Sequence, residues 1–262
     1  MKEEWVACEY FNHLARKYDH YRTLDEAPVH YLINNVPGSD QTICDLGCGT
    51  GRYLIKIIKA FQESGVRIND AYGVDISPAM LETAKLHADG LNNPVSWILA
   101  TSDRTGLSEQ SISLVTAFNS FHHLPVAETL TEVARILSPG AFLAIYTRTR
   151  EQEAEHIWGR WFPGYLDYSQ VPTRIIMRGL SRYNKRFRLT QVKDFTFMRR
   201  VPFSWVCEQT ENRYYSTLDR YPPGEFESSY AVFLENIKVN CQHLDEIMYN
   251  SSYSLFLYQL ES

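Results

Sequence analysis

Apolar residues follow two alternating spacings along the first 150 positions of the chain. Short apolar runs indicate buried strands, whereas apolar residues three and four positions apart indicate one face of a helix. The runs predict strands at 42–46, 71–74, 95–99, 114–118 and 141–147, and helices at 52–61, 78–87 and 126–137. Strands that alternate with helices in this way predict an α/β domain with a parallel, doubly wound sheet.

The pattern changes beyond residue 150, where aromatic side chains crowd one short span. These are Trp158, Trp161, Phe162, Tyr165 and Tyr168. Later apolar runs predict a sixth strand at 192–201, a helix at 226–241 and a final strand at 253–260. The chain therefore resumes its strand and helix pattern after an aromatic insertion.

Glycines fill the turn between the first strand and the first helix, in the string Gly47-Cys48-Gly49-Thr50-Gly51. A turn of this kind needs backbone angles that a Cβ disfavours and lets a ligand approach the main chain closely. The helix that follows offers free N–H groups to a polar or anionic ligand. Asp75 ends the second strand, at the distance expected of a carboxylate that accepts both ribose hydroxyls of an adenosine-containing cofactor.

The spacing of the glycines identifies the class of cofactor. A dinucleotide site would need a third glycine where this chain has Arg52. The string D-L-G-C-G-T-G instead resembles the first motif of the class I S-adenosylmethionine-dependent methyltransferases, which matches at Asp45, Gly47, Gly49 and Gly51. The resemblance is to the small-molecule branches typified by ubiquinone/menaquinone and trans-aconitate methyltransferases. It implies a mostly parallel, seven-stranded Rossmann-like sheet with a lid insertion after strand five, and S-adenosyl-L-methionine as cofactor with S-adenosyl-L-homocysteine as product.

The segment 10–22, which precedes the first strand, resembles the F-x-x-x-A-x-x-Y-D-x-Y-R lead-in of the same family. We expect this segment to be helical. The resemblance implies that it caps the cofactor and that Tyr18 and Arg22 help to hold the methionine carboxylate. An amphipathic helix packed on the edge of the sheet is an equally good interpretation.

Adenine recognition is less clear from the motifs. The resemblance places Ile76 against one face of the adenine ring. The family's acidic and small residues after strand three align with Thr101 and Ser102, so the chain lacks the usual acid, although Asp103 follows two positions later. Either Thr101 or Asp103, together with the Ser102 N–H, would then meet the adenine. The usual aspartate of a later motif is Ser113 here.

Two histidines lie in the loop after strand four, where ligands bind in open α/β sheets. His122 would be the general base if the reaction needs one, since histidine titrates near neutral pH. Alternatively, His122 and His123 orient the loop or pack beneath the cofactor, and this interpretation is favoured. Metal binding is not expected, because adjacent histidines rarely converge on one ion. The complete set of expected cofactor contacts is Tyr18, Arg22, Asp45, Gly47, Cys48, Gly49, Gly51, Asp75, Ile76, Thr101, Ser102, Asp103, Asn119 and Ser120.

Basic residues dominate residues 174–200, which contain nine Lys or Arg and one acid, Asp194. Arg174, Arg178, Arg182 and Arg186 recur at every fourth position, which predicts an amphipathic helix with an arginine stripe. The stripe is a solvated helix face by default. It could also bind a carboxylate or phosphate of the substrate, since the guanidinium fork suits oxyanions, or contact RNA.

These assignments divide the chain into four parts. Residues 1–35 form a helical cap over the cofactor site, 36–150 the cofactor-binding core, 151–225 a lid that includes strand six, and 226–262 a closing helix and antiparallel strand of the core.

The net charge of −5 argues against a protein that coats nucleic acid. Five cysteines without metal spacing predict free thiols in a reducing compartment. No signal-peptide core or long apolar span is evident, so we expect a soluble cytoplasmic protein.

The sequence thus favours an enzyme that moves a methyl group from S-adenosyl-L-methionine to an O, N or C nucleophile of a small, aromatic or acidic metabolite. Neither a nucleic acid nor a membrane is an expected partner, and the oligomeric state is open. One alternative is a non-catalytic cofactor-binding protein of the same fold, which the missing acids at positions 101 and 113 support. Another is an RNA methyltransferase, which the arginine stripe would serve.

Overall fold

The computed structural model describes residues 2–170 and 180–261. The described residues divide into two compact units. Unit 1 lies within Met1–Thr147, Arg174–Lys193 and Leu255–Ser262, and unit 2 lies within Arg148–Thr173 and Asp194–Ser254. Each unit is described by itself below.

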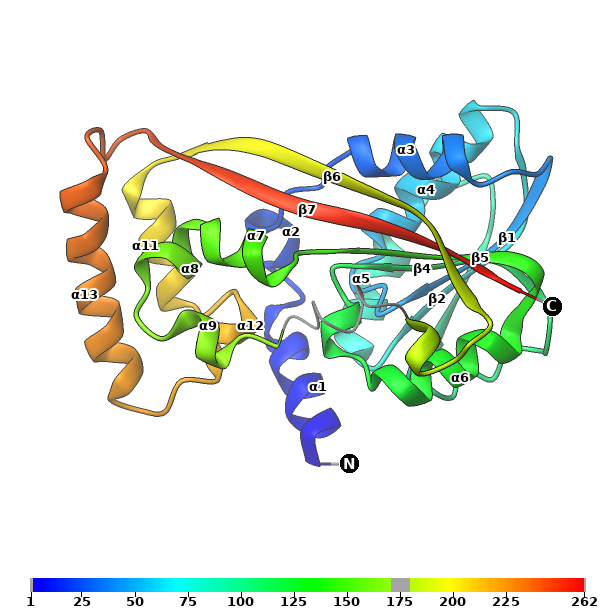
Figure 1. Cartoon of the computed structure of the whole chain (residues 1–262), viewed down its shortest axis with the longest axis horizontal. Coiled ribbons are helices and arrows are strands. Elements are labelled where there is room, and N and C mark those ends of the chain that lie inside the picture. Colours follow the sequence, from blue (N-terminus) through cyan, green and yellow to red (C-terminus); the bar gives the residue numbers. More distant parts are fainter. Residues whose placement is uncertain (1, 171–179, 262) are drawn as a thin grey trace. The chain divides into compact units, whose positions relative to one another are not determined.

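Unit 1 contains the strands and helices that alternate along the first 147 residues (Figure 1). Its elements are α1 (Lys2–Leu14), α2 (Tyr18–Tyr21), α3 (Ala27–Asn35), β1 (Asp40–Leu46), α4 (Arg52–Glu63), β2 (Arg67–Asp75), α5 (Pro78–His87), β3 (Val95–Leu99), β4 (Ile112–Phe118), η1 (Phe121–His123), α6 (Val126–Ile136), β5 (Leu137–Thr147) and η2 (Leu180–Arg182). The seven-stranded sheet has the order β3-β2-β1-β4-β5-β7-β6, and β1 to β5 pair in parallel. The expected doubly wound, mostly parallel sheet is confirmed.

The last two strands, β6 (Phe187–Val201) and β7 (Ile247–Leu260), run antiparallel to each other. Thr190 donates a hydrogen bond to the Leu257 carbonyl, and Arg188 donates one to Gln259, so residue numbers rise in β6 as they fall in β7. Gln259 also donates to the carbonyl of Gly140 at the start of β5, which places the end of β7 beside the beginning of β5. Both strands begin earlier than residues 192 and 253, where the apolar runs predicted them, because this pairing continues beyond the apolar residues.

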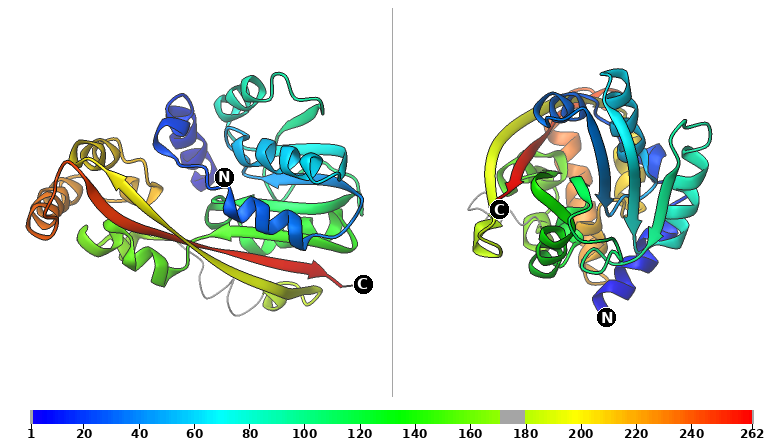
Figure 2. Two further views of the ribbon diagram at one scale, coloured as in Figure 1. Left: turned by 90° about the horizontal axis from the view of Figure 1, so that it is seen from above. Right: turned by 90° about the vertical axis from the view of Figure 1, so that its right-hand side faces the viewer.

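Helices cover both faces of the unit 1 sheet, with α3 and α4 on one side of the strands and α6 on the other (Figures 1 and 2). The spacing that predicted α4 corresponds to its buried face, since Leu54, Ile57, Ile58 and Phe61 are fully buried. Burying an aliphatic or aromatic side chain of this size contributes about 1.5–3 kcal/mol. The predicted cap of α5 is also present, because the Ser77 hydroxyl accepts a hydrogen bond from the Met80 N–H and Pro78 opens the helix.

Residues 10–22 are helical in two pieces, because α1 ends at Leu14 and a turn separates it from α2. The interruption lets the first turn of α2 bond to the glycine loop, as described below. The strand predicted at 141–147 begins earlier, since residues 137–140 already belong to β5 and Ser138 donates a hydrogen bond to the Gln110 carbonyl.

The predicted arginine helix does not reach residue 186. Within this span the described residues form the short helix η2, and residues 183–186 then form turns before β6 begins. Arg174 and Arg178 lie outside the described residues. Arg186 donates a hydrogen bond to the Glu261 carbonyl, and Arg188 forms an ion pair with Glu261. The described arginines therefore bond along the edge of the sheet.

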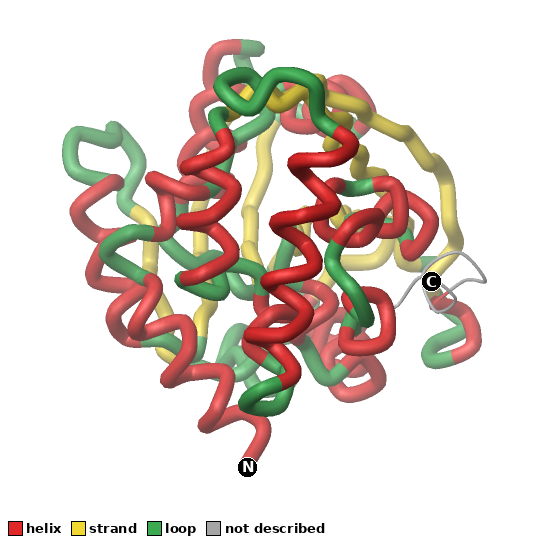
Figure 3. The backbone as a smooth tube through the Cα atoms, turned by 90° about the vertical axis from the view of Figure 1, so that its left-hand side faces the viewer, coloured by secondary structure: helices red, strands yellow, loops and turns green. Residues whose placement is uncertain are grey.

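Unit 2 is built around a second apolar cluster, to which Trp158, Phe162, Val206 and Phe233 belong. Its helices are α7 (Arg150–Glu155), α8 (Ile157–Trp161), α9 (Tyr165–Tyr168), α11 (Phe203–Glu211), α12 (Ser216–Asp219) and α13 (Glu225–Asn240). Helices rather than strands form the near side of this unit in Figure 3. The sequence predicted α13 as part of the core, but α13 belongs to unit 2 because its apolar side chains pack into this cluster.

Buried polar contacts join β1 to β4. The Thr116 hydroxyl donates to Asp45 Oδ1 at 2.6 Å, and the Ser113 hydroxyl donates to Gln41 Oε1 at 2.6 Å. Burial raises the pKa of the Asp45 carboxyl to about 7, although the Thr116 hydrogen bond opposes this shift. Asp45 is 2 % exposed, so its ionised form lacks water as a hydrogen-bond partner.

None of the helices in the described parts of the chain combines the length and the apolar character needed to cross a membrane.

The raised pKa of Asp45 predicts a pH-dependent stability. A carboxyl with a pKa of about 7 in the folded chain keeps a proton between about pH 4 and 7, where the unfolded chain has lost it. Its contribution to the free energy of unfolding should therefore fall as pH rises through this window, by up to about 4 kcal/mol. Urea unfolding at several pH values should show this fall for the wild type relative to Asp45→Asn. A constant difference between the two proteins from pH 4.5 to 7.5 would contradict the assignment.

Candidate functional site

The glycine loop connects β1 to α4 and has the left-handed backbone conformation that its sequence predicts. Gly47, Gly49 and Gly51 have φ values of +65°, +54° and +73°. The Gly47 N–H donates to the Val74 carbonyl, and the Gly51 carbonyl accepts the Ile55 N–H as the first bond of α4. The loop therefore lies at the carboxyl edge of the sheet, next to the end of β2, where ligands of open α/β sheets bind.

Asp75, the last residue of β2, holds this loop in place. Its Oδ2 accepts the Gly49 N–H at 2.8 Å, and its Oδ1 accepts the Ser77 N–H at 2.9 Å. The carboxylate is 9 % exposed, and burial raises its pKa, although the two N–H groups act in the opposite direction. Each carboxylate oxygen has more than one lone pair, so Asp75 can accept further hydrogen bonds.

The three glycines of the loop are not equivalent. A Cβ at Gly47 would lie 2.6 Å from the Ser120 Cβ, and a Cβ at Gly51 would lie 2.5 Å from the Trp97 ring. A Cβ at Gly49 would meet only the Met80 sulfur, at 4.0 Å. Close packing therefore requires glycine at positions 47 and 51, whereas the space beside Gly49 is not filled by the protein. Cys48, between them, is 7 % exposed, and its thiol lies against Gly73.

The N-terminal segment bonds directly to the glycine loop. The Thr50 hydroxyl donates to Asp19 Oδ1 at 2.9 Å, and the Arg52 guanidinium lies 3.8 Å from the same oxygen. The Cζ atoms of Arg22 and Arg52 lie 5.6 and 5.5 Å from the centre of the Tyr18 ring. Tyr18 and Arg22 therefore flank Asp19, which makes the bond to the loop.

Helix α1 bonds to the segment that follows Asp75. Asn12 Oδ1 accepts the Ser77 hydroxyl at 2.6 Å and the Ala79 N–H at 3.4 Å, and the Cys8 thiol donates to the Ile76 carbonyl. Ile76 is half-buried. The sequence analysis did not identify Asn12 or Asp19. Asp19 is the acid of the Y-D-x-Y-R string, so its position between Tyr18 and Arg22 was a usable signal, whereas Asn12 had none.

The loop after β3 contains the three candidates for adenine recognition. The Ser102 hydroxyl bonds to the Thr129 hydroxyl at 2.7 Å, so this side chain is used within the protein. Thr101 is half-buried. Asp103 differs from both, because its Oδ1 is buried and has no hydrogen-bond partner among the described residues. Buried oxygens without a partner are rare in proteins, and each requires an explanation.

This loop is held on α6 by hydrogen bonds to Glu132, which also pairs with Arg135 of the same helix. The Glu132 carboxylate accepts the N–H and the hydroxyl of Thr105 at 2.9 and 2.6 Å, and it accepts two guanidinium bonds from Arg135. The Arg135 bonds and the Thr105 bonds lower the pKa of Glu132 to about 2, against the effect of burial. Glu132 is therefore ionised at neutral pH, and the loop is fixed close to Asp103.

The loop after β4 contains Asn119, Ser120 and the two histidines. Asn119 has a φ of +56°, which asparagine tolerates better than most residues, and its N–H donates to the Tyr146 carbonyl. The Ser120 hydroxyl donates to the Leu46 carbonyl at 2.6 Å and so fixes the residue that directly precedes the glycine loop. The His122 and His123 rings are in contact, with their centres 4.0 Å apart and their planes tilted by 47°, and His123 also packs edge-on against Phe11.

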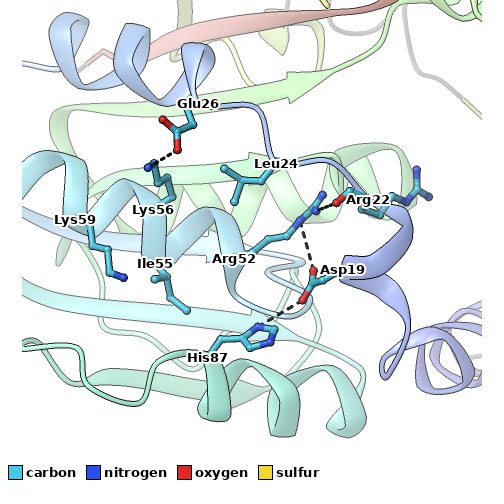
Figure 4. Close-up of a pocket in the computed structure, with 9 residues that line it drawn as sticks. All are labelled: Asp19, Arg22, Leu24, Glu26, Arg52, Ile55, Lys56, Lys59 and His87. Carbon is cyan, nitrogen blue, oxygen red and sulfur yellow. Dashed lines mark hydrogen bonds and ion pairs between the residues drawn. The ribbon is translucent and has the colours of Figure 1, made fainter. Parts of the chain in front are cut away.

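A hollow of about 540 Å³ lies beside the glycine loop, between α2 and the outer side of α4 (Figure 4). Arg22, Arg52, Lys56 and Lys59 line it, together with Asp19 and Glu26. Lys56 bonds to Glu26, and Arg52 points toward Asp19, so acidic partners offset part of the positive charge. Neither the three loop glycines nor Asp75 line the hollow. The hollow is therefore distinct from the proposed cofactor site at the carboxyl edge of the sheet.

Comparison with known proteins supports the motif. A family model described as "Methyltransferase domain" matches residues 43–140. The chain is 26 % identical over 160 residues to the ubiquinone/menaquinone biosynthesis C-methyltransferase of Rickettsia prowazekii, a match that covers 57 % of this chain and 64 % of that relative. It is 23 % identical over 215 residues to the ubiquinone biosynthesis O-methyltransferase of Saccharophagus degradans, covering 80 % of this chain and 84 % of that relative.

A solved structure shows the same fold. The geranyl diphosphate C-methyltransferase of Streptomyces coelicolor, in complex with Mg²⁺, geranyl diphosphate and S-adenosyl-L-homocysteine, aligns with a TM-score of 0.53 and 15 % identity over 90 % of this chain and 79 % of that one. These similarities agree with the glycine-loop motif, and residues 43–140 are similar to a methyltransferase domain.

Proposed function

We propose that this chain transfers the methyl group of S-adenosyl-L-methionine to an O, N or C nucleophile of a small metabolite. The observation that carries the proposal is the bond from the Gly49 N–H to the Asp75 carboxylate, which fixes a left-handed glycine loop at the carboxyl edge of the sheet. The methyl donor supplies an activated methyl group on a sulfonium, which is already a good leaving group. The protein then has to bind the donor and align the acceptor.

The residues at this edge have the chemistry that the donor requires. Asp75 would accept the ribose hydroxyls, and the space beside Gly49 would admit the ligand close to the main chain. Asp103 Oδ1, a buried acceptor that has no partner among the described residues, would accept a hydrogen bond from the adenine amino group. Of the two alternatives for adenine recognition, Thr101 and Asp103, we therefore favour Asp103. Tyr18 and Arg22 would close over the methionine end.

Positioning is proposed as the main source of catalysis. Holding two reactants in line can lower a barrier by roughly 7–11 kcal/mol, whereas a general base contributes about 3–5 kcal/mol. His122 packs against His123, which packs on Phe11, so the contacts of the pair support a role in shaping the loop. His122 acts at most as an auxiliary base in this proposal.

Two observations weigh against the alternative functions. The missing acid at position 113 supported a non-catalytic protein, but Ser113 bonds to Gln41 and Thr42 between β1 and β4, so its role is in the sheet. The arginine stripe supported RNA methylation, but Arg186 of the stripe donates a hydrogen bond to the Glu261 carbonyl, and the nearby Arg188 forms an ion pair with Glu261. Two relatives are named as methyltransferases of ubiquinone or menaquinone biosynthesis, which supports an aromatic acceptor here. Five free cysteines support a reducing, cytoplasmic setting.

Gly49→Val should abolish cofactor binding, because its side chain would enter the space that the ligand needs. Calorimetry with S-adenosyl-L-homocysteine should show no heat of binding for this variant. Gly90→Val is the matched control, since Gly90 also has a positive φ, of +81°, and a Cβ there would meet nothing within 4 Å. Equal affinity of both variants would remove the glycine loop from the proposed site.

Asp103→Ala should weaken the binding of S-adenosyl-L-homocysteine about 10- to 100-fold, as expected for a lost charge-assisted hydrogen bond. Thr101→Val should change the dissociation constant less than about threefold, because a change of that size corresponds to less free energy than one hydrogen bond contributes. Titration calorimetry of the two variants decides between them. The reverse order would assign adenine recognition to Thr101.

His122→Ala should slow methyl transfer without abolishing it, because alignment of the reactants remains. Turnover is measured as release of S-adenosyl-L-homocysteine across a panel of small aromatic and acidic metabolites, with His123→Ala as control. The same panel tests the proposed function, which requires turnover of at least one metabolite by the wild type. Complete inactivity of His122→Ala with cofactor affinity intact would instead make His122 essential.

A further inference from the structure

Arg148 is a buried cation without an acidic partner in contact. It directly follows β5, is 8 % exposed and belongs to unit 2. Its Nη2 donates to the Ser251 hydroxyl at 2.9 Å and to the Tyr253 hydroxyl at 2.7 Å. Among the described residues, no carboxylate lies within 4.0 Å of the guanidinium, the limit for an ion pair. Hydroxyl groups satisfy hydrogen bonds but leave the charge uncompensated.

Part of the guanidinium has no hydrogen-bond partner. The Nε of Arg148 is buried and bonds to no described residue. Glu153 is an acidic residue whose charge acts on Arg148. Its carboxylate accepts the Ser169 hydroxyl, however, and burial raises the pKa of Glu153 despite the opposing effects of Ser169, Arg148 and Arg150. Burying a charge without a partner destabilises a fold. The arrangement is therefore better explained by a ligand than by stability.

The surroundings define the direction from which a ligand reaches Arg148. The Arg148 Cζ lies over the Tyr253 and Tyr215 rings, 4.4 and 5.8 Å from their centres. With Nη2 bonded to the two hydroxyls, the buried Nε is the donor that remains for an acceptor. A guanidinium edge suits the oxygens of carboxylates and phosphates.

Further aromatic rings pack around Tyr215, next to Arg148. Tyr215 packs against Trp158 at 4.6 Å and against His156 at 5.7 Å between ring centres, and Tyr249 packs edge-on against His156 at 5.1 Å. A ligand whose oxyanion met Arg148 would place its carbon skeleton next to these rings.

We propose that Arg148, with Ser251 and Tyr253, forms a subsite for an oxyanion of the methyl acceptor, in which the Arg148 Nε–H binds a carboxylate or phosphate oxygen. That this oxyanion belongs to the acceptor rests on the proposed function, whereas the subsite itself rests on the contacts of Arg148. The subsite narrows the acceptor to an organic acid or phosphate ester, with an aromatic skeleton favoured by the surrounding rings.

The test uses the full chain saturated with S-adenosyl-L-homocysteine and three probes, benzoate, benzamide and inorganic phosphate. Calorimetry should show that benzoate or phosphate binds and that benzamide, the neutral analogue, binds at least 10-fold more weakly. The tighter of the two charged probes identifies the oxyanion as a carboxylate or a phosphate. Arg148→Gln should weaken the binding of that probe at least 10-fold and leave the affinity for S-adenosyl-L-homocysteine unchanged. Arg150→Gln, an exposed neighbour, is the matched control and should have no effect.

Thermal unfolding provides a second measurement on the same proteins. The preferred probe should raise the Tm of the wild type and of Arg150→Gln but not that of Arg148→Gln. If Arg148→Gln does not fold, Arg148→Lys keeps the charge but loses the Nε donor, and it should bind the probe at least threefold more weakly. The subsite is refuted if neither charged probe binds better than benzamide, or if the Arg148 variants bind like the wild type. If the wild type did not bind S-adenosyl-L-homocysteine, the proposed function would be refuted instead.

Discussion

The carboxylate of Asp75 bonds to both loops that start helices at the carboxyl edge of β1 and β2. It accepts the N–H of Gly49, ahead of α4, and the N–H of Ser77, which caps α5. Burial makes ionisation of Asp75 unfavourable, and these N–H groups favour the ionised form. The position of the glycine loop and the charge of Asp75 therefore depend on each other, and the start of two helices depends on both.

The N-terminal segment extends this arrangement. Asp19 accepts the Thr50 hydroxyl in the glycine loop, and Asn12 accepts the Ser77 hydroxyl in the loop after β2. Helices α1 and α2 are thus bonded to the two loops that Asp75 joins. Because all these bonds lie at the end of the strands, a ligand placed there would contact residues that are already fixed, which reduces the entropy lost on binding.

The sequence was sufficient to predict the parts of the fold that follow local rules. Apolar periodicity located β1 to β4 and α4 to α6, and Ser77 and Pro78 marked the start of α5. It was insufficient where distant pairing decides the outcome. The first residues of β6 and β7 are polar or mixed, and they are strands because each bonds to the later residues of the other strand. Likewise, nothing in the local pattern showed that Arg148 would be buried or that Asp103, rather than Thr101, would hold an oxygen without a partner.

Asp103 and Arg148 share a property that the fold alone does not explain. Each buries a polar atom that bonds to no described residue, an acceptor at Asp103 Oδ1 and a donor at Arg148 Nε. Packing cannot account for either atom, because an apolar residue of similar size would avoid the cost of desolvation. A buried polar atom is expected to have a partner, and the described residues supply none to either atom. Their opposite polarities then indicate different ligand groups, an amino group for Asp103 and an oxyanion for Arg148, as a donor and an acceptor of a methyl group would supply.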